Sequence, residues 1–241
     1  PGLYDDYYEE DSYDDYGGGG SGSGGGDSGT TFSGTNSADN VDKSAESTAW
    51  TFNGMSGTDT FLGGSGSDKF WGGLGGDTLT GNGGSDTFYF SDNTEGLDTI
   101  TDFTAGSGGD SLKFNQPFGS SYTRTNYGTD AGSNGSAYNI AGNSNVLPKV
   151  FNFTANNNGY ASSSSTISFL SNLRITTDGS NPIAGGESFI IITGNGSHSA
   201  VYSWTDGGDG AVSGGELMGL ATLNNVNNDT LASTNFSFGA I

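Results

Sequence analysis

Four aspartates recur at nine-residue intervals in the first half of the chain: Asp59, Asp68, Asp77 and Asp86. Each follows a glycine-rich stretch, so a carboxylate and the carbonyl oxygens of a tight turn come together at a fixed spacing. Calcium takes hard oxygen ligands of these two kinds from proteins. The spacing therefore predicts a row of calcium sites, because without a cation the carboxylates would only repel one another.

The aspartates belong to four consecutive nonapeptides that can be written in register: GMSGTDTFL from Gly54, GGSGSDKFW from Gly63, GGLGGDTLT from Gly72 and GNGGSDTFY from Gly81. Glycine occupies positions one and four of every copy, and aspartate occupies position six. Glycine allows sharp turns with positive φ that expose carbonyl oxygens. The apolar residue at position eight is expected to begin a short strand and to point inward. Nine residues then make one turn and one strand, so successive turns alternate between the two sides of a flattened coil.

This block resembles the RTX (repeat-in-toxin) calcium-binding family, whose pattern is GGxGxDxUx with an apolar residue at U. The resemblance implies a parallel β-roll with Asp59 and Asp77 on one side and Asp68 and Asp86 on the other. It also implies backbone carbonyl ligands at Gly54, Ser56, Gly63, Ser65, Gly72, Leu74, Gly81 and Gly83.

The repeats depart from the family pattern at their outer copies. Met55 and Asn82 replace the second glycine, so the outer turns are expected to bind calcium less well. Phe52 falls at position eight of a preceding copy that lacks the glycine loop, and we expect it to cap the roll.

Two further segments hold candidate ligands. Residues 98–114 are similar to the strand that often follows the roll in RTX proteins. This likeness implies a calcium site at Asp98 and Asp102, assisted by Asp110; solvated loop aspartates are the alternative. Residues 205–217 partly resemble an EF-hand loop with Glu216 at position twelve and Asp209 at position five. Thr205 and Gly207 do not fit that pattern and Asp206 is one place off, so a plain acidic turn is an equal alternative to a site at Asp206, Asp209 and Glu216.

The charge and the residue types exclude several classes of protein. The chain has 27 Asp and Glu against 6 Lys and Arg, a formal net charge of −21. This balance argues against nucleic-acid binding and disfavours compaction unless cations bind. The absence of cysteine excludes disulfides, thiolate zinc sites and a cysteine nucleophile. His198 is the one histidine, so histidine-rich zinc motifs do not occur. No apolar stretch approaches the roughly 20 residues of a transmembrane helix. We therefore expect a protein that is not an enzyme.

The composition also indicates the fold class. The 45 glycines, together with many Ser, Thr and Asn residues, disfavour helices, and 15 Phe, 11 Tyr and 3 Trp favour a folded core. We expect an all-β protein in which a short parallel β-roll packs against a C-terminal, sandwich-like β-rich region. Strands are predicted at 49–52, 97–103, 111–115, 148–154, 165–170, 172–177, 187–193, 199–204 and 230–238, with one short helix at 214–223.

Three parts are expected along the chain. Residues 1–29 form an acidic, tyrosine-rich tail and a Gly/Ser linker, residues 30–114 the roll with its flanking strands, and residues 115–241 the C-terminal domain. The tail is interpreted either as a disordered segment or as a strand that docks on a neighbouring copy. The final residues resemble the uncleaved C-terminal signals of RTX proteins exported by type I secretion, which implies an extracellular or cell-surface location.

These features lead to two hypotheses about function. In the first, several Ca²⁺ ions drive folding and bridge subunits of a secreted protein that self-assembles as an extracellular filament or S-layer. Its partners would be copies of itself and cell-surface polysaccharide. In the alternative, the chain is the C-terminal calcium-binding and secretion module of a larger adhesin or of a secreted hydrolase.

Overall fold

The structure is a computed structural model, and it describes residues 30–91, 94–115, 127–130, 138–139, 150–153, 175–176, 188–205, 207 and 216–239. Strands dominate these residues, and the helical elements among them are two single-turn 3-10 helices, η2 (Asn228–Thr230) and η3 (Ser233–Asn235). The expected all-β class is therefore confirmed. Among the described residues, no helix is both long and apolar enough to span a membrane.

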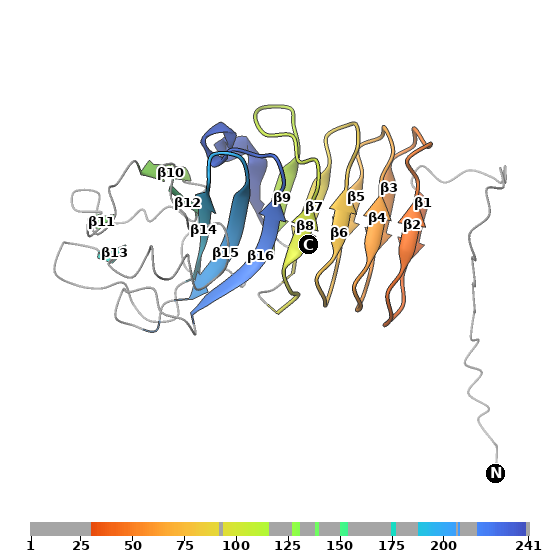
Figure 1. Ribbon diagram of the computed structural model, residues 1–241, viewed down its shortest axis with the longest axis horizontal. Helices are drawn as coiled ribbons and strands as arrows, with labels where there is room; N and C mark the ends of the chain where they lie inside the picture. The colour runs from red at the N-terminus through yellow and green to blue at the C-terminus, as the bar shows by residue number, and fades with distance from the viewer. Residues whose placement is uncertain are drawn as a thin grey trace, which may run out of the picture.

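Residues 30–114 form a parallel β-roll, as the repeats predict (Figure 1). Successive strands alternate between two sheets. The first sheet of the roll contains β1 (Thr30–Ser33), β3 (Trp50–Asn53), β5 (Lys69–Trp71), β7 (Thr87–Phe90) and β9 (Ser111–Phe114). The second contains β2 (Asn40–Asp42), β4 (Thr60–Leu62), β6 (Thr78–Thr80) and β8 (Asp98–Ile100). Every pairing between these strands is parallel.

The position-eight residues form the core between the two sheets. In the first sheet Phe52 pairs with Phe70, which pairs with Phe88, and their ring centroids lie 4.8 and 5.0 Å apart. Phe61 and Leu79 pair in the second sheet. All five side chains are buried. A one-residue slip would turn the whole column toward solvent, so this column fixes the register of the roll.

The expectation that Phe52 caps the roll is wrong. Two further strands precede it, and Phe32 of β1 pairs in register with Phe52. The Phe32 ring also packs edge-on against Phe61, with centroids 5.7 Å apart, and Val41 of β2 packs on the same cluster. The roll extends upstream because these apolar residues keep the inward position, even though their turns lack most of the glycines of the repeat.

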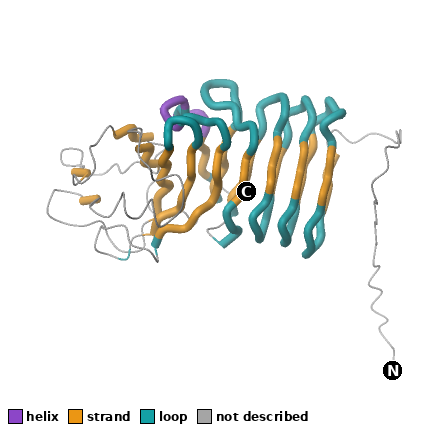
Figure 2. Tube along the Cα trace, viewed as in Figure 1, coloured by secondary structure: helices purple, strands orange, loops and turns teal. Residues whose placement is uncertain are grey.

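The two sheets continue into the C-terminal part of the chain. β14 (Ser188–Gly194), β15 (Ser199–Thr205) and β16 (Leu217–Leu223) form an antiparallel meander. β16 lies parallel to β8, and β17 (Phe236–Phe238) lies parallel to β9. β12 (Val150–Phe153) and β10 (Tyr127–Asp130) extend the larger sheet beyond β14. β11 (Tyr138–Asn139) and β13 (Ile175–Thr176) pair separately. Figure 2 shows the meander beside the coils of the roll.

Most of the predicted strands are present. The segments predicted at 49–52, 97–103, 111–115, 148–154, 172–177, 187–193 and 199–204 overlap, in order, with β3, β8, β9, β12, β13, β14 and β15. Of the strand predicted at 230–238, only 236–238 is a strand, β17, and it follows the 3-10 helix η3. The segment predicted at 165–170 lies outside the described residues.

The short helix predicted at 214–223 is wrong, because residues 217–223 form β16. Leu217, Leu220 and Leu223 are buried at a spacing of three, which resembles a helix. The register between β15 and β16 shifts at Leu220: Val201 pairs with Ala221, whereas Tyr202 pairs with Gly219. This irregularity inserts one residue and converts the two-residue period of a strand into a spacing of three.

We expect Phe70→Ala to lower the free energy of unfolding of the calcium-loaded protein by about 3–5 kcal/mol, because it leaves a cavity between two stacked rings. Urea unfolding followed by circular dichroism measures this change. The exposed Asn53→Ala in β3 serves as the control and should change stability by less than about 0.5 kcal/mol. Similar losses in the two variants would show that the phenylalanine column does not hold the roll together.

Candidate metal centre

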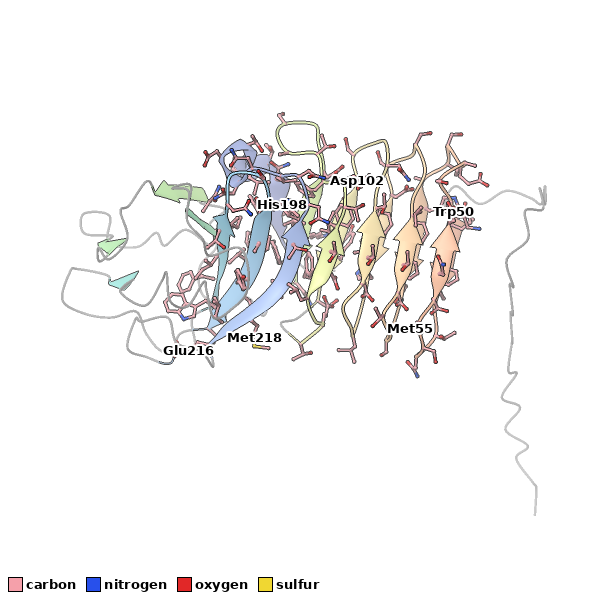
Figure 3. All side chains as sticks on the ribbon, viewed as in Figure 1. Trp50, Met55, Asp102, His198, Glu216 and Met218 are labelled. Carbon is pink, nitrogen blue, oxygen red and sulfur yellow. The ribbon has the colours of Figure 1, made fainter. Side chains whose placement is uncertain are left out.

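The turns of the roll lie along two opposite edges. We call the row of turns 34–39, 54–59, 72–77 and 91–98 the first edge, and the row 43–49, 63–68, 81–86 and 101–110 the second edge. In Figure 3 the first edge carries the label Met55 and the second the label Asp102. Asp59 and Asp77 end turns of the first edge, and Asp68 and Asp86 end turns of the second. This is the pairing that the repeats predict.

One carboxylate oxygen of each aspartate binds the backbone of the preceding coil on the same edge. On the first edge, the backbone N–H of Asp39 donates to Asp59 Oδ1 (2.9 Å), that of Asp59 to Asp77 Oδ1 (2.8 Å), and that of Asp77 to Asp98 Oδ1 (3.0 Å). These bonds form a continuous ladder, so each aspartate joins two coils through its Oδ1 atom.

The second edge repeats this ladder. The backbone N–H of Trp50 donates to Asp68 Oδ1 (2.6 Å), that of Asp68 to Asp86 Oδ1 (2.7 Å), and that of Asp86 to Asp110 Oδ1 (2.9 Å). Both ladders therefore leave the Oδ2 atoms to face the turns.

The Oδ2 atoms point into spaces that suit a cation. Asp59, Asp77 and Asp86 each bury an Oδ2 that has no hydrogen-bond donor. A Cβ added to Gly54 would collide both with Asp59 Oδ2 and with the carbonyl oxygen of Gly72 from the next turn. A carboxylate oxygen and a carbonyl oxygen of two successive turns thus converge on one small space. Oxygen ligands without a hydrogen-bond donor are what a hard divalent cation requires.

The same arrangement occurs on the second edge. A Cβ added to Gly63 would meet Asp68 Oδ2 and, at 2.9 Å, the carbonyl oxygen of Gly81. Asp68 Oδ2 also accepts a bond from the backbone N–H of Gly64 (2.8 Å). The carbonyls of Gly72 and Gly81 therefore lie where the repeat predicts ligands.

Other predicted carbonyl ligands already take part in bonds between turns. The Leu74 carbonyl accepts from the backbone N–H of Gly57 (2.8 Å), and the Gly63 carbonyl accepts from Asn82 Nδ2 (2.7 Å). The Gly54 carbonyl lies 2.8 Å from the position of a Cβ on Gly34. The carbonyls of Ser56, Ser65 and Gly83 remain predictions.

Burial makes the ionised form of these carboxylates costly. Asp59, Asp68, Asp77, Asp86, Asp98 and Asp110 are each at most 3% exposed, and burial is the main cause of a raised pKa in all six. The pKa rises to about 6 at Asp59 and to about 7 at Asp86. At Asp98 it rises to about 8, with further contributions from the carboxylates of Asp77 and Glu95. A bound cation would remove this cost.

Asp98 and Asp102 are not brought together as predicted. They flank β8 at opposite ends, so Asp98 joins the ladder of the first edge while Asp102 lies on the second. Asp102 accepts from the backbone N–H groups of Gly81 (3.0 Å) and Asn82 (2.7 Å). Asp98 is the first residue of β8 and Asp102 follows the end of that strand, so they belong to turns at opposite ends of β8 and do not share one site.

Sequence reasoning missed two members of the ladders. Asp39 ends the outermost turn of the first edge, and the spacing Gly34, Asp39, Val41 matches Gly54, Asp59, Phe61 and would have identified it. Asp110 was expected only to assist, but it occupies the ladder position, two residues before the inward Leu112.

The turn that contains Asp110 is braced from the C-terminal segment. Asn235 is fully buried, and its Oδ1 accepts from the backbone N–H of Gly106 (2.9 Å). Its Nδ2 donates to the carbonyl oxygen of Asp110 (2.7 Å). The longer turn between β8 and β9 is therefore held in place by a residue from more than a hundred positions along the chain.

The second edge ends at a different pair of residues. Trp50 stands where the next aspartate of the ladder would be, since its backbone N–H bonds to Asp68. Lys43 Nζ lies 4.4 Å from the centroid of the Trp50 ring. A cation–π contact thus occupies the end of this row, and no carboxylate among the described residues continues the ladder beyond it.

Only one member of the EF-hand-like candidate can be placed. Asp206 and Asp209 lie outside the described residues. Glu216 Oε1 accepts from the backbone N–H of Gly207 (2.8 Å), and Oε2 accepts from Trp204 Nε1 (3.3 Å). Glu216 therefore fastens the segment after β15, and its role as a ligand remains a prediction.

Within the described part of the chain, no three His, Cys, Asp or Glu side chains gather at one point. This agrees with sites built from one carboxylate per turn and backbone carbonyls. His198 lies in the turn between β14 and β15, where its Nδ1 accepts from the backbone N–H of Asn225 (3.1 Å).

The comparisons with known proteins agree with this geometry. Residues 53–88 match the RTX calcium-binding nonapeptide repeat in four copies. No curated protein matches the chain. RTX repeats bind calcium and are typical of secreted proteins and of non-enzymatic structural domains, although enzymes can carry them. The family match covers four turns, whereas the ladders extend from Asp39 to Asp98 on the first edge and from Trp50 to Asp110 on the second.

We expect Asp77→Asn to weaken calcium binding by about tenfold or more, because it removes one carboxylate charge from the site. The amide still accepts the Asp59 N–H bond, so the metal-free fold should be no less stable than that of the wild type. Isothermal calorimetry and circular dichroism during a calcium titration measure both effects. Asp42→Asn, at an exposed aspartate outside the ladders, is the control. Equal calcium affinity in the two variants would assign Asp77 a purely structural role.

The raised pKa values also predict how the metal-free protein responds to pH. A carboxyl whose folded pKa lies above its unfolded value of about 3.9 stabilises the fold at low pH. That stability is lost as the pH rises through the folded values, which reach about 6 to about 8. The calcium-depleted chain should therefore contain more β structure at pH 5 than at pH 8, as far-UV circular dichroism measures. A β content that rises from pH 5 to pH 8 would contradict the burial of protonated carboxyls.

Proposed function

We propose that this chain, whose residues 53–88 are four RTX calcium-binding nonapeptide repeats, is a secreted structural protein that assembles with copies of itself at a cell surface. Calcium drives its folding and bridges subunits, and the assembly is an extracellular filament or S-layer.

The buried carboxylates support the role of calcium as a folding switch. The net charge of −21 keeps the metal-free chain expanded by self-repulsion. Outside a cell, millimolar calcium saturates sites with dissociation constants of roughly 10⁻⁴–10⁻³ M. The free energy of binding then becomes free energy of folding, because the unfolded chain has no preformed site. The resemblance of the C-terminal residues to type I secretion signals supports export of the unfolded chain.

The proposed assembly rests on the N-terminal end of the roll, which we call the open end. Among the described residues, β1 and β2 are the outermost strands of their sheets, so each has one edge without a paired strand. An exposed parallel edge is a template for another strand. Natural proteins usually cover or charge such edges, whereas the residues of β1 are Thr30, Thr31, Phe32 and Ser33.

The alternative is a calcium-binding and secretion module at the C-terminal end of a larger adhesin or secreted hydrolase. The continuity of the roll with β16 and β17 favours a unit that folds as one body, and such a unit would serve either purpose. The two functions differ in whether this chain by itself associates.

We expect calcium to convert the chain from coil to β structure and then into large assemblies. Far-UV circular dichroism should show the first change, and sedimentation velocity in millimolar calcium should show the second. An unchanged β spectrum in excess EGTA would contradict calcium-driven folding. A chain that folds on calcium but stays strictly monomeric would contradict assembly and favour the module of a larger protein.

A further inference from the structure

The outer face of the first sheet carries a row of large side chains. Side chains alternate along each strand, so Phe70 and Phe88 point into the core while their neighbours point outward. Trp71 of β5 pairs with Tyr89 of β7, and Tyr89 pairs with Lys113 of β9. These three outward residues therefore lie side by side across three strands.

The two rings of this row pack face to face between the lysines, with Trp71 half-buried and Tyr89 only 9% exposed. The Trp71 and Tyr89 rings stack with centroids 3.7 Å apart and an interplanar angle of 10°. Lys113 Nζ lies 5.3 Å from the centroid of Tyr89. Lys69, two residues before Trp71, is exposed on the same face. We call Lys69, Trp71, Tyr89 and Lys113 the cationic face.

The cationic face differs in charge from the rest of the molecule. The chain has 27 Asp and Glu against 6 Lys and Arg. Yet the outward positions of β3, β5, β7 and β9 contain no carboxylate; they are Thr51, Asn53, Lys69, Trp71, Thr87, Tyr89, Ser111 and Lys113. Two ammonium groups thus stand beside stacked rings, on a surface without an acidic neighbour in the same rows. Such a surface suits a ligand that is both acidic and aromatic.

We propose that the cationic face binds the acidic, tyrosine-rich segment 1–16 of a second copy of this chain, an inference that rests on the proposed assembly. The segment reads PGLYDDYYEEDSYDDY, with seven Asp or Glu residues, five Tyr residues and no Lys or Arg. Its carboxylates complement Lys69 and Lys113, and its phenol rings can stack on Trp71.

The geometry of this contact favours a second copy. The segment and the face that it binds are two different parts of the chain, so the contact joins two unlike surfaces. Each copy then donates one segment and accepts another, and a head-to-tail contact of this kind produces open filaments when the rotation does not close a ring. The glycine- and serine-rich residues 17–29 give the segment a reach of about 20 Å. A linker of this length would also let the segment reach the cationic face of its own copy, and the mixing experiment distinguishes these two cases.

The test begins with single variants of the full chain in millimolar calcium. Lys69→Glu and Trp71→Thr should each weaken association by about tenfold, because the first reverses a charge that faces the segment and the second removes the stacking surface. Met218→Glu is the control, since it adds a negative charge at an exposed side chain of β16, away from both the face and the open end, and should leave association within about twofold. Circular dichroism checks that each variant still folds with calcium.

A mixing experiment identifies the occupant. One chain has Lys in place of all seven acidic residues of segment 1–16 and a wild-type face, and the other carries Lys69→Glu and Lys113→Glu with a wild-type segment. Each chain alone presents like charges and should associate weakly. In the mixture, each segment meets a face of opposite charge on the other chain, so sedimentation velocity should show restored association.

The outcomes separate the two proposals. If the wild-type chain is monomeric in calcium, the proposed assembly and this inference both fail. If the wild type assembles and Lys69→Glu and Trp71→Thr assemble equally well, only the inference fails. If the single variants weaken association but the mixture does not restore it, the face takes the segment of its own copy or another acidic partner such as a polysaccharide, and a second copy's segment is not the occupant.

Discussion

The burial of aspartates in the turns is the constraint on which the rest of this structure depends. Each ladder aspartate gives Oδ1 to the backbone of the preceding coil, and at Asp59 and Asp68 the Oδ2 atom lies beside a carbonyl oxygen of a neighbouring turn. Such a column of carboxylates is unfavourable by itself, because desolvation and mutual repulsion both oppose ionisation. A divalent cation between successive turns would offset both terms. Phenylalanine stacking holds the coils together inside, and the aspartate ladders join them along the edges.

Because phenylalanines pack inside the roll and aspartates line its edges, the strands and the turns have very different sequences. The strands are three or four residues long and supply one or two inward apolar side chains each, which is too little to stabilise a single coil. Stacking nine-residue units buries a continuous column, as in other repeat proteins. The turns carry the glycines and aspartates, since tight curvature and oxygen ligands are needed only there. Met55 and Asn82 show the limit of this rule: both adopt positive φ, 65° and 61°, where other repeats place glycine.

The two ends of the roll differ in the strands that pair with them. At the C-terminal end, β16 and β17 pair with β8 and β9, and Asn235 braces the turn that carries Asp110. At the N-terminal end, β1 and β2 are outermost among the described strands, and the second edge stops at Trp50 and Lys43. The C-terminal strands therefore cover the coils of the roll at one end, and no described strand covers them at the other.

The sequence by itself determined the local chemistry of the roll. The nine-residue spacing of Asp59, Asp68, Asp77 and Asp86 identified the turns, their division between two edges and the inward phenylalanines, because these depend on contacts that recur at a fixed interval. The tertiary structure decided what breaks that interval. Asp39, Asp98 and Asp110 join the ladders across longer turns. Asp98 and Asp102 lie at opposite ends of β8. The register shift at Leu220 gives the strand β16 a spacing of apolar residues that resembles a helix. Insertions and pairings between distant segments change which residues meet without changing the local pattern, so only the folded chain could reveal them.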